Sequence, residues 1–103
     1  MPVVKYTPAA KQDLFDIWEW GVDNHGKVQA ERFADEIAQT FLKIAAMPYA
    51  YIERPKLGEG IRSKPFQKKY TIFYYPIEEG IVVVRVLRGS RDIDIEFSTS
   101  GIY

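Results

Sequence analysis

The 103-residue sequence contains no cysteine and only one histidine, His25. Without cysteine there is no disulfide framework, no thiolate nucleophile and no thiolate metal site. A lone histidine in a predicted turn would leave a zinc site almost entirely to carboxylates, which is not how proteins usually bind zinc. The sequence also lacks the glycine-rich loops that hold phosphates. We therefore expect no metal and no other cofactor.

Long apolar runs are absent too. No run approaches the roughly 20 residues that cross a bilayer, and the first residues lack the basic and apolar regions of a secretory signal peptide. Hydrophobic residues make up 47% of the chain and charged residues 27%, as in folded soluble proteins. We expect one cytoplasmic domain over residues 1–103 without membrane contact, in which residues 93–103 form a loosely ordered tail.

Basic residues are concentrated in one part of an otherwise neutral chain. Lys plus Arg and Asp plus Glu each number 14. Residues 54–91 nevertheless hold nine basic residues against three glutamates. A concentrated basic field attracts an acidic partner even when the whole protein is neutral. The charge distribution therefore indicates a binding surface in the second half of the sequence.

Hydrophobic patterning predicts one short strand, two helices and then three strands. Apolar residues recur at spacings of three and four in both helices. Thr7 and Pro8 suit the N-cap and first turn of the first helix. The predicted strands are 2–6, 61–66, 69–77 and 81–88, the predicted helices are 8–22 and 27–47, the turn between the helices is 23–26, and a loop covers 48–60. This order, β-α-α-β-β-β, predicts an α+β fold in which an antiparallel sheet packs on an antiparallel helical hairpin and leaves its other face partly open.

Five basic side chains form the candidate binding surface: Arg62, Lys64, Arg85, Arg88 and Arg91. Strict alternation along 81–88 sends the even-numbered valines to one face and Arg85 to the other. If the valines meet the helices, Arg85 projects from the open face of the sheet. Arginine suits flat, bidentate recognition of carboxylate or phosphate. For any single arginine, a weak surface ion pair is the alternative interpretation.

Other side chains have simpler interpretations. Among the helix aromatics, we expect Trp18 in the core and Trp20 open for contact with a partner. Asp13 and Asp16 look like members of a solvated helix face, because paired catalytic carboxylates more often come from different elements.

Five stretches of the sequence resemble the ParE/RelE superfamily of bacterial toxins. In order they are YTPAAKQDLFDIWEW, AERFADEIAQTFLKIAAMP, GIRS, YTIFYY and VVVRVLRGSRD, which together extend from Tyr6 to Asp92. The similarity is closest to the ParE branch. It implies the α+β fold predicted above and a type II toxin that inhibits DNA gyrase by binding, with no catalytic residue of its own.

The alternative is the RelE branch, whose members are ribosome-dependent mRNA endonucleases. That branch carries two basic residues on the second strand and one after the last strand, which Arg62, Lys64 and Arg91 match. It also carries an arginine after the third-strand tyrosine and a Tyr or His near the C-terminus, where this sequence has Thr71 and Phe97. Neither side chain supplies the positive charge or the proton transfer that RNA cleavage needs. The resemblance therefore favours the branch that acts by binding.

The resemblance implies two partners, a ParD-like antitoxin and DNA gyrase, with nucleic acid approached only through the gyrase–DNA complex. Trp20 and the region of Ile52 are candidate antitoxin contacts, because a sheet edge and a helical hairpin can accept an added strand or helix. A homodimer and a toxin–antitoxin hetero-oligomer both stay open, as does an inactive relative that only binds its antitoxin. Tyr103 is a conceivable substitute for the missing C-terminal Tyr or His of the endonuclease branch.

Overall fold

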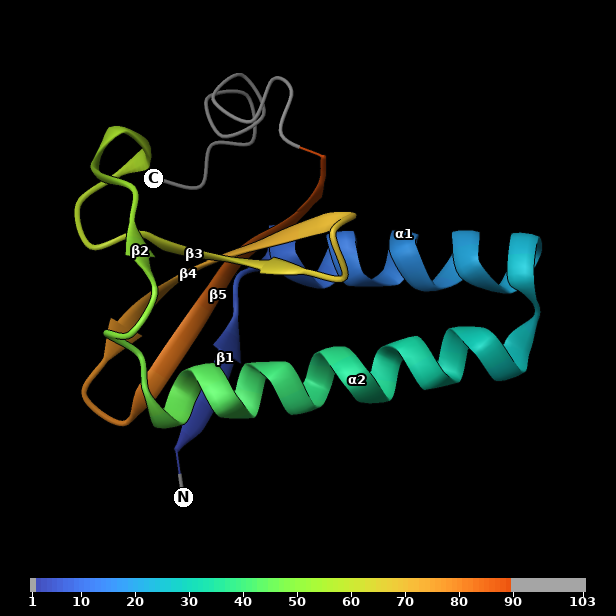
Figure 1. Cartoon of the computed structure of the whole chain (residues 1–103), viewed down its shortest axis with the longest axis horizontal. Coiled ribbons are helices and arrows are strands. Elements are labelled where there is room, and N and C mark those ends of the chain that lie inside the picture. Colours follow the sequence, from blue (N-terminus) through green and yellow to red (C-terminus); the bar gives the residue numbers. More distant parts are fainter. Residues whose placement is uncertain (1, 90–103) are drawn as a thin grey trace.

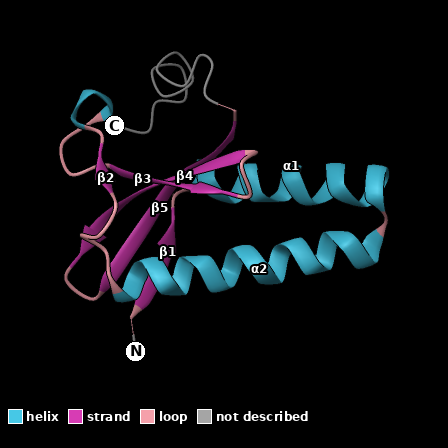
Figure 2. Cartoon of the chain, in the orientation of Figure 1, coloured by secondary structure: helices cyan, strands magenta, loops and turns pink. Residues whose placement is uncertain are grey.

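The computed structural model describes residues 2–89, which form two helices and a five-stranded sheet (Figure 1 and Figure 2). In chain order the elements are β1 (Val3–Tyr6), α1 (Pro8–His25), α2 (Lys27–Ala46), β2 (Ile52–Glu53), the 3-10 turn η1 (Pro55–Leu57), β3 (Arg62–Phe66), β4 (Tyr70–Ile77) and β5 (Gly80–Arg88). The α+β class and all predicted helices and strands are confirmed. The predicted loop additionally contains β2 and η1, and the predicted tail and Arg91 lie outside the described residues.

The two helices form the predicted antiparallel hairpin, but the turn between them is shorter than expected. Thr7 caps α1 by accepting a hydrogen bond from the backbone N–H of Ala10 at 3.0 Å, and Pro8 follows in the first turn. At the other end α1 continues to His25, and Gly26 alone makes the turn with φ of 87°. Glycine adopts this left-handed backbone without a steric penalty. Among residues 2–89, no helix has both the length and the hydropathy needed to cross a membrane.

The sheet has the strand order β1-β5-β4-β3-β2, and one of its four pairings corrects the prediction. β1 runs parallel to β5, whereas the other neighbours are antiparallel as expected. Thr7 fixes the end of β1 by donating from its backbone N–H to Val83 O at 3.0 Å and from its hydroxyl to Val84 O at 2.7 Å. Gly80 permits the close approach, since a Cβ there would lie 1.9 Å from the carbonyl oxygen of Val3. The sheet is therefore mixed.

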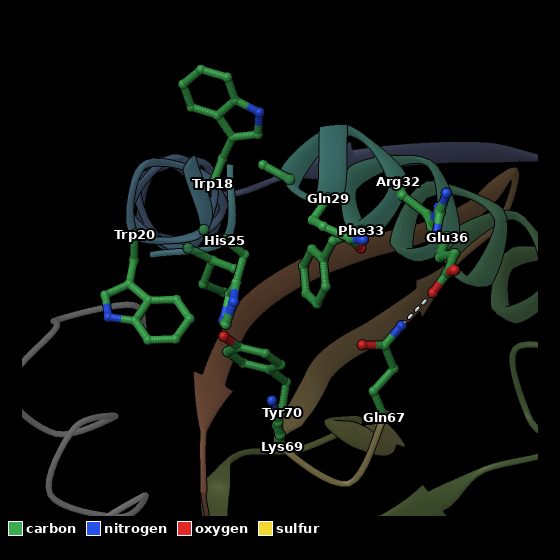
Figure 3. A pocket seen from close by; sticks show the side chains of 13 residues that line it. Trp18, Trp20, His25, Gln29, Arg32, Phe33, Glu36, Gln67, Lys69 and Tyr70 are labelled. Carbon is green, nitrogen blue, oxygen red and sulfur yellow. Dashed lines mark hydrogen bonds between the residues drawn. The ribbon is translucent and has the colours of Figure 1, made fainter. Parts of the chain in front are cut away.

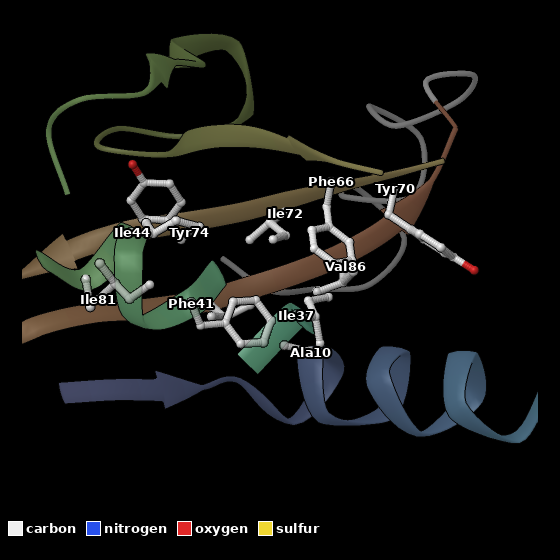
Figure 4. Packing of buried hydrophobic residues seen from close by; sticks show 12 residues of the cluster. Ala10, Ile37, Phe41, Ile44, Phe66, Tyr70, Ile72, Tyr74, Ile81 and Val86 are labelled. Atoms are coloured by element: carbon white, nitrogen blue, oxygen red, sulfur yellow. The ribbon is translucent and has the colours of Figure 1, made fainter. Parts of the chain in front are cut away.

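The main core lies between the helices and one face of the sheet (Figure 4). Ile37, Phe41 and Ile44 of α2 pack against Ile72 and Val83 of the sheet, and all five side chains are buried. The stripe at spacings of three and four on α2 thus becomes the surface that covers the sheet. This core packs the helical hairpin against β4 and β5.

The opposite face of the sheet carries a second, smaller hydrophobic cluster. This second cluster of Ile61, Phe73, Val84 and Leu87 is buried, with Leu57 of η1 packed against it. The register of β4 and β5 shifts between Phe73, which pairs with Arg85, and Tyr74, which pairs with Val83. This β-bulge breaks the strict alternation expected along β5. The predicted facing of its valines is therefore wrong: Val83 and Val86 face the main core, while Val84 faces the second cluster.

Candidate binding surface

Arg85 does not project from an open sheet face as predicted, because it is held by Asp13 of α1. The guanidinium donates from Nε and Nη2 to the two carboxylate oxygens at 2.7 and 2.8 Å. The backbone N–H of Val86 donates to the same carboxylate at 3.0 Å. Both side chains of the pair are 12% exposed. The bidentate pair thus joins α1 to the bulge of β5.

Asp13 is consequently not part of a solvated face, and the sequence did contain a signal for its burial. It lies three residues after Ala10 and four before Ile17, two positions of the inward face of α1. A carboxylate on the apolar stripe of a helix needs a buried partner. Arg85, within the apolar strand β5, is this partner.

Arg62 and Lys64 lie close together, as expected from their spacing on β3. Arg62 donates to the backbone carbonyls of Tyr49 at 3.3 Å and Tyr51 at 2.7 Å, and its guanidinium forms a 3.1 Å ion pair with Glu53. Through these bonds Arg62 holds the segment after α2 against the sheet. The Lys64 ammonium lies 4.9 Å from the centre of the Tyr51 ring.

Beside Lys64, β3 and the second half of α2 border a hollow of about 550 Å³. Lys43 of α2 also lines it, and so does Glu36. The strand β2 pairs with β3 at Arg62 and Ser63, and within residues 2–89 it does not continue beside Lys64. This stretch of β3 is therefore a sheet edge at which Lys64 is the basic side chain.

Arg88 and Trp20 form a second basic site, where β5 ends beside α1. The guanidinium carbon lies 5.1 Å from the centre of the Trp20 ring, and both residues are exposed. Trp20 also packs edge-on against His25, with the ring centres 5.2 Å apart. The expectation that Trp20 is open is confirmed, whereas the expectation that Trp18 is in the core is wrong, since 38% of Trp18 is exposed. Figure 3 shows the Trp18 ring pointing away from Tyr70 and Phe33, on the other side of α1 from Trp20.

The four predicted cations within residues 2–89 thus do not form one patch on the free side of the sheet. Arg62 and Lys64 lie beside β2 and the chain after α2, whereas Arg85 and Arg88 border one hollow beside α1. Arg91 lies outside the described residues. Ile52 is 71% exposed on the edge strand β2, so this candidate antitoxin contact is accessible.

A further hollow, which the sequence did not reveal, separates the helical hairpin from the turn between β3 and β4 (Figure 3). Its volume is about 330 Å³. Apolar parts of its lining come from both helices and β4, and they are Ile17, Trp20, Gly21, Ala30, Phe33 and Tyr70. Arg32 and Lys69 also line it, while Gln67 of the turn donates a hydrogen bond to the carboxylate of Glu36.

Two tyrosines have perturbed acidity, and both are structural. Burial raises the pKa of Tyr74 to about 12, and it also raises the pKa of Tyr6. The hydroxyl of Tyr74 donates to the carbonyl of Pro48 at 2.6 Å. Among residues 2–89, no three His, Asp or Glu side chains gather in a way that could hold a metal ion.

Comparisons of the sequence with known proteins agree on one family, and a comparison of the structure shows a similar fold. Residues 4–93 match the family described as "ParE toxin of type II toxin-antitoxin system, parDE". The proteins named Toxin ParE1 from two strains of Mycobacterium tuberculosis, CDC 1551 / Oshkosh and H37Rv, are each 34% identical over 89 residues, which cover 85% of this chain and 90% of theirs. A solved structure titled "Chromosomal ParDE TA system from P. aeruginosa" has a similar fold, with a TM-score of 0.72, 20% identity, and coverage of 87% of this chain and 98% of that chain.

Proposed function

This chain belongs to the ParE toxin family of type II toxin–antitoxin systems, and we propose that it arrests growth by binding DNA gyrase. In this proposal the toxin has no catalytic residue, and its effect comes from the contacts that it makes with the gyrase–DNA complex. It acts in the cytoplasm, and a ParD-like antitoxin neutralises it by binding the toxin.

The observation that carries this proposal is the exposed Arg88–Trp20 pair at the end of β5. Stacking on the indole ring holds the guanidinium in a defined place at the surface. A positioned guanidinium recognises carboxylates and phosphates in a bidentate manner. The chain continues from Arg88 to Arg91, so a second arginine follows within three residues. We assign this end of β5 to the target contact.

The remaining cations of the predicted surface have different parts in the proposal. Lys64 lies half-buried at the sheet edge beside Tyr51 and is a second point of target contact. Arg62 and Arg85 are positioning residues, because their bonds to backbone carbonyls and to Asp13 fix the segments that carry the exposed cations.

Two features favour binding over RNA cleavage. Thr71 stands where the endonuclease branch carries a cation, and Phe97 stands where that branch carries a group able to transfer a proton. Arg62, which matches a basic residue of that branch, donates three hydrogen bonds within the protein. A guanidinium with these donors engaged has less capacity to stabilise the charge that develops at a phosphate.

The proposed antitoxin contacts are Trp20 and the edge of the sheet near Ile52. Trp20 is 41% exposed and Ile52 is 71% exposed. Large exposed apolar side chains that border cations suit a partner segment carrying both apolar and acidic side chains. The short strand β2 also leaves an edge to which an added strand can pair.

Supercoiling of relaxed plasmid by purified gyrase and ATP tests the proposal. We expect the toxin without antitoxin to inhibit supercoiling and to trap linear DNA that a denaturant reveals. Arg88→Glu should raise the toxin concentration needed for half inhibition by about tenfold or more, which corresponds to roughly 1.4 kcal/mol of binding. Lys56→Glu makes the same charge change on η1, at a residue that does not line the hollow bordered by Trp20 and Arg88, and should act like the unchanged toxin.

Supercoiling that proceeds normally with excess toxin would refute the gyrase assignment. Cleavage of messenger RNA that requires the ribosome would then favour the endonuclease alternative. A chain that binds its antitoxin but allows normal growth when expressed alone would instead be an inactive member of the family.

A further inference from the structure

The hollow between the hairpin and the β3–β4 turn has the character of a docking site for an apolar segment. Ala30 and Phe33 line it from α2, Ile17 and Trp20 from α1, and Tyr70 from β4. Figure 3 shows Trp20, Tyr70 and Phe33 around the same space. A hollow of about 330 Å³ is at the lower end of the size at which proteins bind ligands. It therefore suits one or two large apolar side chains.

The charges around this hollow favour an acidic occupant. Arg32 and Lys69 line it, and Arg88 stacks on Trp20 beside it. Glu36 is the acidic residue of the lining, and its carboxylate already accepts a hydrogen bond from Gln67. An apolar segment that also carries carboxylates would complement both the lining and its cations.

The described chain ends beside this hollow. The backbone N–H of Gly89 donates to the carbonyl oxygen of Lys69 at 2.9 Å, and Lys69 is part of the lining. Gly89 has φ of 75°, a left-handed backbone that turns the chain as it leaves β5. Residues 90–103 therefore begin next to the hollow.

The sequence that follows has the required composition. Residues 92–97 read Asp-Ile-Asp-Ile-Glu-Phe, so carboxylates alternate with large apolar side chains. In an extended chain these two sets point to opposite sides. Four Cα–Cα steps connect Gly89 to Ile93, and they span at most about 13 Å. The segment can therefore reach the hollow without displacing any strand.

We propose that residues 92–97 of the same chain dock in this hollow through the apolar side chains of Ile93, Ile95 and Phe97, and that the cations Arg32 and Lys69 attract the carboxylates of the segment. The covalent link makes the docking intramolecular, so a weak contact is occupied without a high protein concentration. A partner that binds Trp20 has to displace the segment, a consequence that rests on the proposed antitoxin contact.

The test uses the fluorescence of Trp20 in the full-length chain. Trp18→Phe leaves Trp20 as the single tryptophan, because the sequence has two. In this background, Ile93→Ser, Ile95→Ser and Phe97→Ser together should raise the constant for quenching by acrylamide about twofold. The matched control changes Ser98, Thr99 and Ser100 to alanine and should leave the constant unchanged. Equal constants for the two triple variants would overturn the proposal.

A charge reversal in the lining gives a second test that leaves the tail intact. Arg32→Glu should also raise quenching of Trp20, whereas Lys56→Glu on η1 should not. Protection that disappears on dilution to a monomer would show that the tail of a second copy fills the hollow, and this result would overturn docking within one chain. These measurements need no gyrase, so their failure is distinct from failure of the proposed function.

Discussion

Replacing Asp13 by alanine tests whether the Asp13–Arg85 pair secures α1 to β5. The substitution removes the carboxylate that accepts two guanidinium bonds and the Val86 backbone bond. Because both side chains of the pair are 12% exposed, water replaces these bonds poorly. Breaking such a buried pair from one side costs about 3–5 kcal/mol. That is a large part of the roughly 5–15 kcal/mol that stabilises a typical domain.

Urea unfolding followed by circular dichroism measures this loss. With a slope of about 1–2 kcal/mol per molar urea, a loss of about 3 kcal/mol lowers the midpoint by roughly 1.5–3 M. The control is Asp16→Ala, since Asp16 is exposed on the same helix and accepts a bond from Gln12. This control should change stability by less than about 0.5 kcal/mol.

Equal stability of the two alanine variants would refute the reasoning about burial. A double variant, Asp13→Leu with Arg85→Met, refines the test. Replacing both members of a buried pair by apolar residues is often neutral. Here the N–H of Val86 would still lose its acceptor, which costs about 1–3 kcal/mol. The double variant should therefore recover a part of the stability that Asp13→Ala loses.

Three further changes follow from the packing and backbone of the sheet. Burial raises the pKa of Tyr74 from 10.0 to about 12, so the unfolded chain loses this proton at a lower pH than the folded chain. The contribution of neutral Tyr74 to the free energy of unfolding is therefore complete below pH 10 and is lost toward pH 12. Tyr74→Phe should reduce the fall in the urea midpoint between about pH 8 and about pH 11. Gly80→Ala should lower stability by about 1–3 kcal/mol in the same assay, since the new Cβ would overlap the backbone of Val3. Lys68 has φ of 61°. Lys68→Gly should raise the free energy of unfolding by roughly 0.5–1 kcal/mol, and with it the urea midpoint, because relief of left-handed strain exceeds the entropy cost of glycine. An unchanged urea midpoint for Gly80→Ala would contradict the close packing of Gly80 on Val3. A lower urea midpoint for Lys68→Gly would contradict the backbone strain at Lys68.

The helices were predictable because their signals are local. Thr7 and Pro8 mark the start of α1, and the apolar stripe of α2 becomes the surface that covers the sheet. The exposure of Trp18 was not predictable from the same periodicity. The stripe tells which residues lie near one face of the helix, but not which residues at its margin the rest of the fold covers, and Trp18 points away from Tyr70 and Phe33 (Figure 3).

The face of Arg85 could not be predicted for a different reason. Alternation along a strand holds only while the register is regular. The bulge between β4 and β5 inserts Val84 between Val83 and Arg85 in the pairing, and the carboxylate of Asp13 satisfies the backbone N–H of Val86 beside it. A contact between residues 13 and 86 has no local sequence signal. The parallel pairing of β1 with β5 was missed for the same reason.

A basic residue on this fold can therefore serve the structure or the target, and the sequence alone does not separate the two roles. Arg85 and Arg62 match the family pattern as well as Arg88 does, yet their guanidiniums are bonded within the protein. Arg88 instead stacks on an exposed ring. Charge reversal at Arg85 should consequently lower the urea midpoint together with any target binding, whereas reversal at Arg88 should lower binding alone. This contrast, measured on the same preparations, distinguishes a positioning residue from a contact residue.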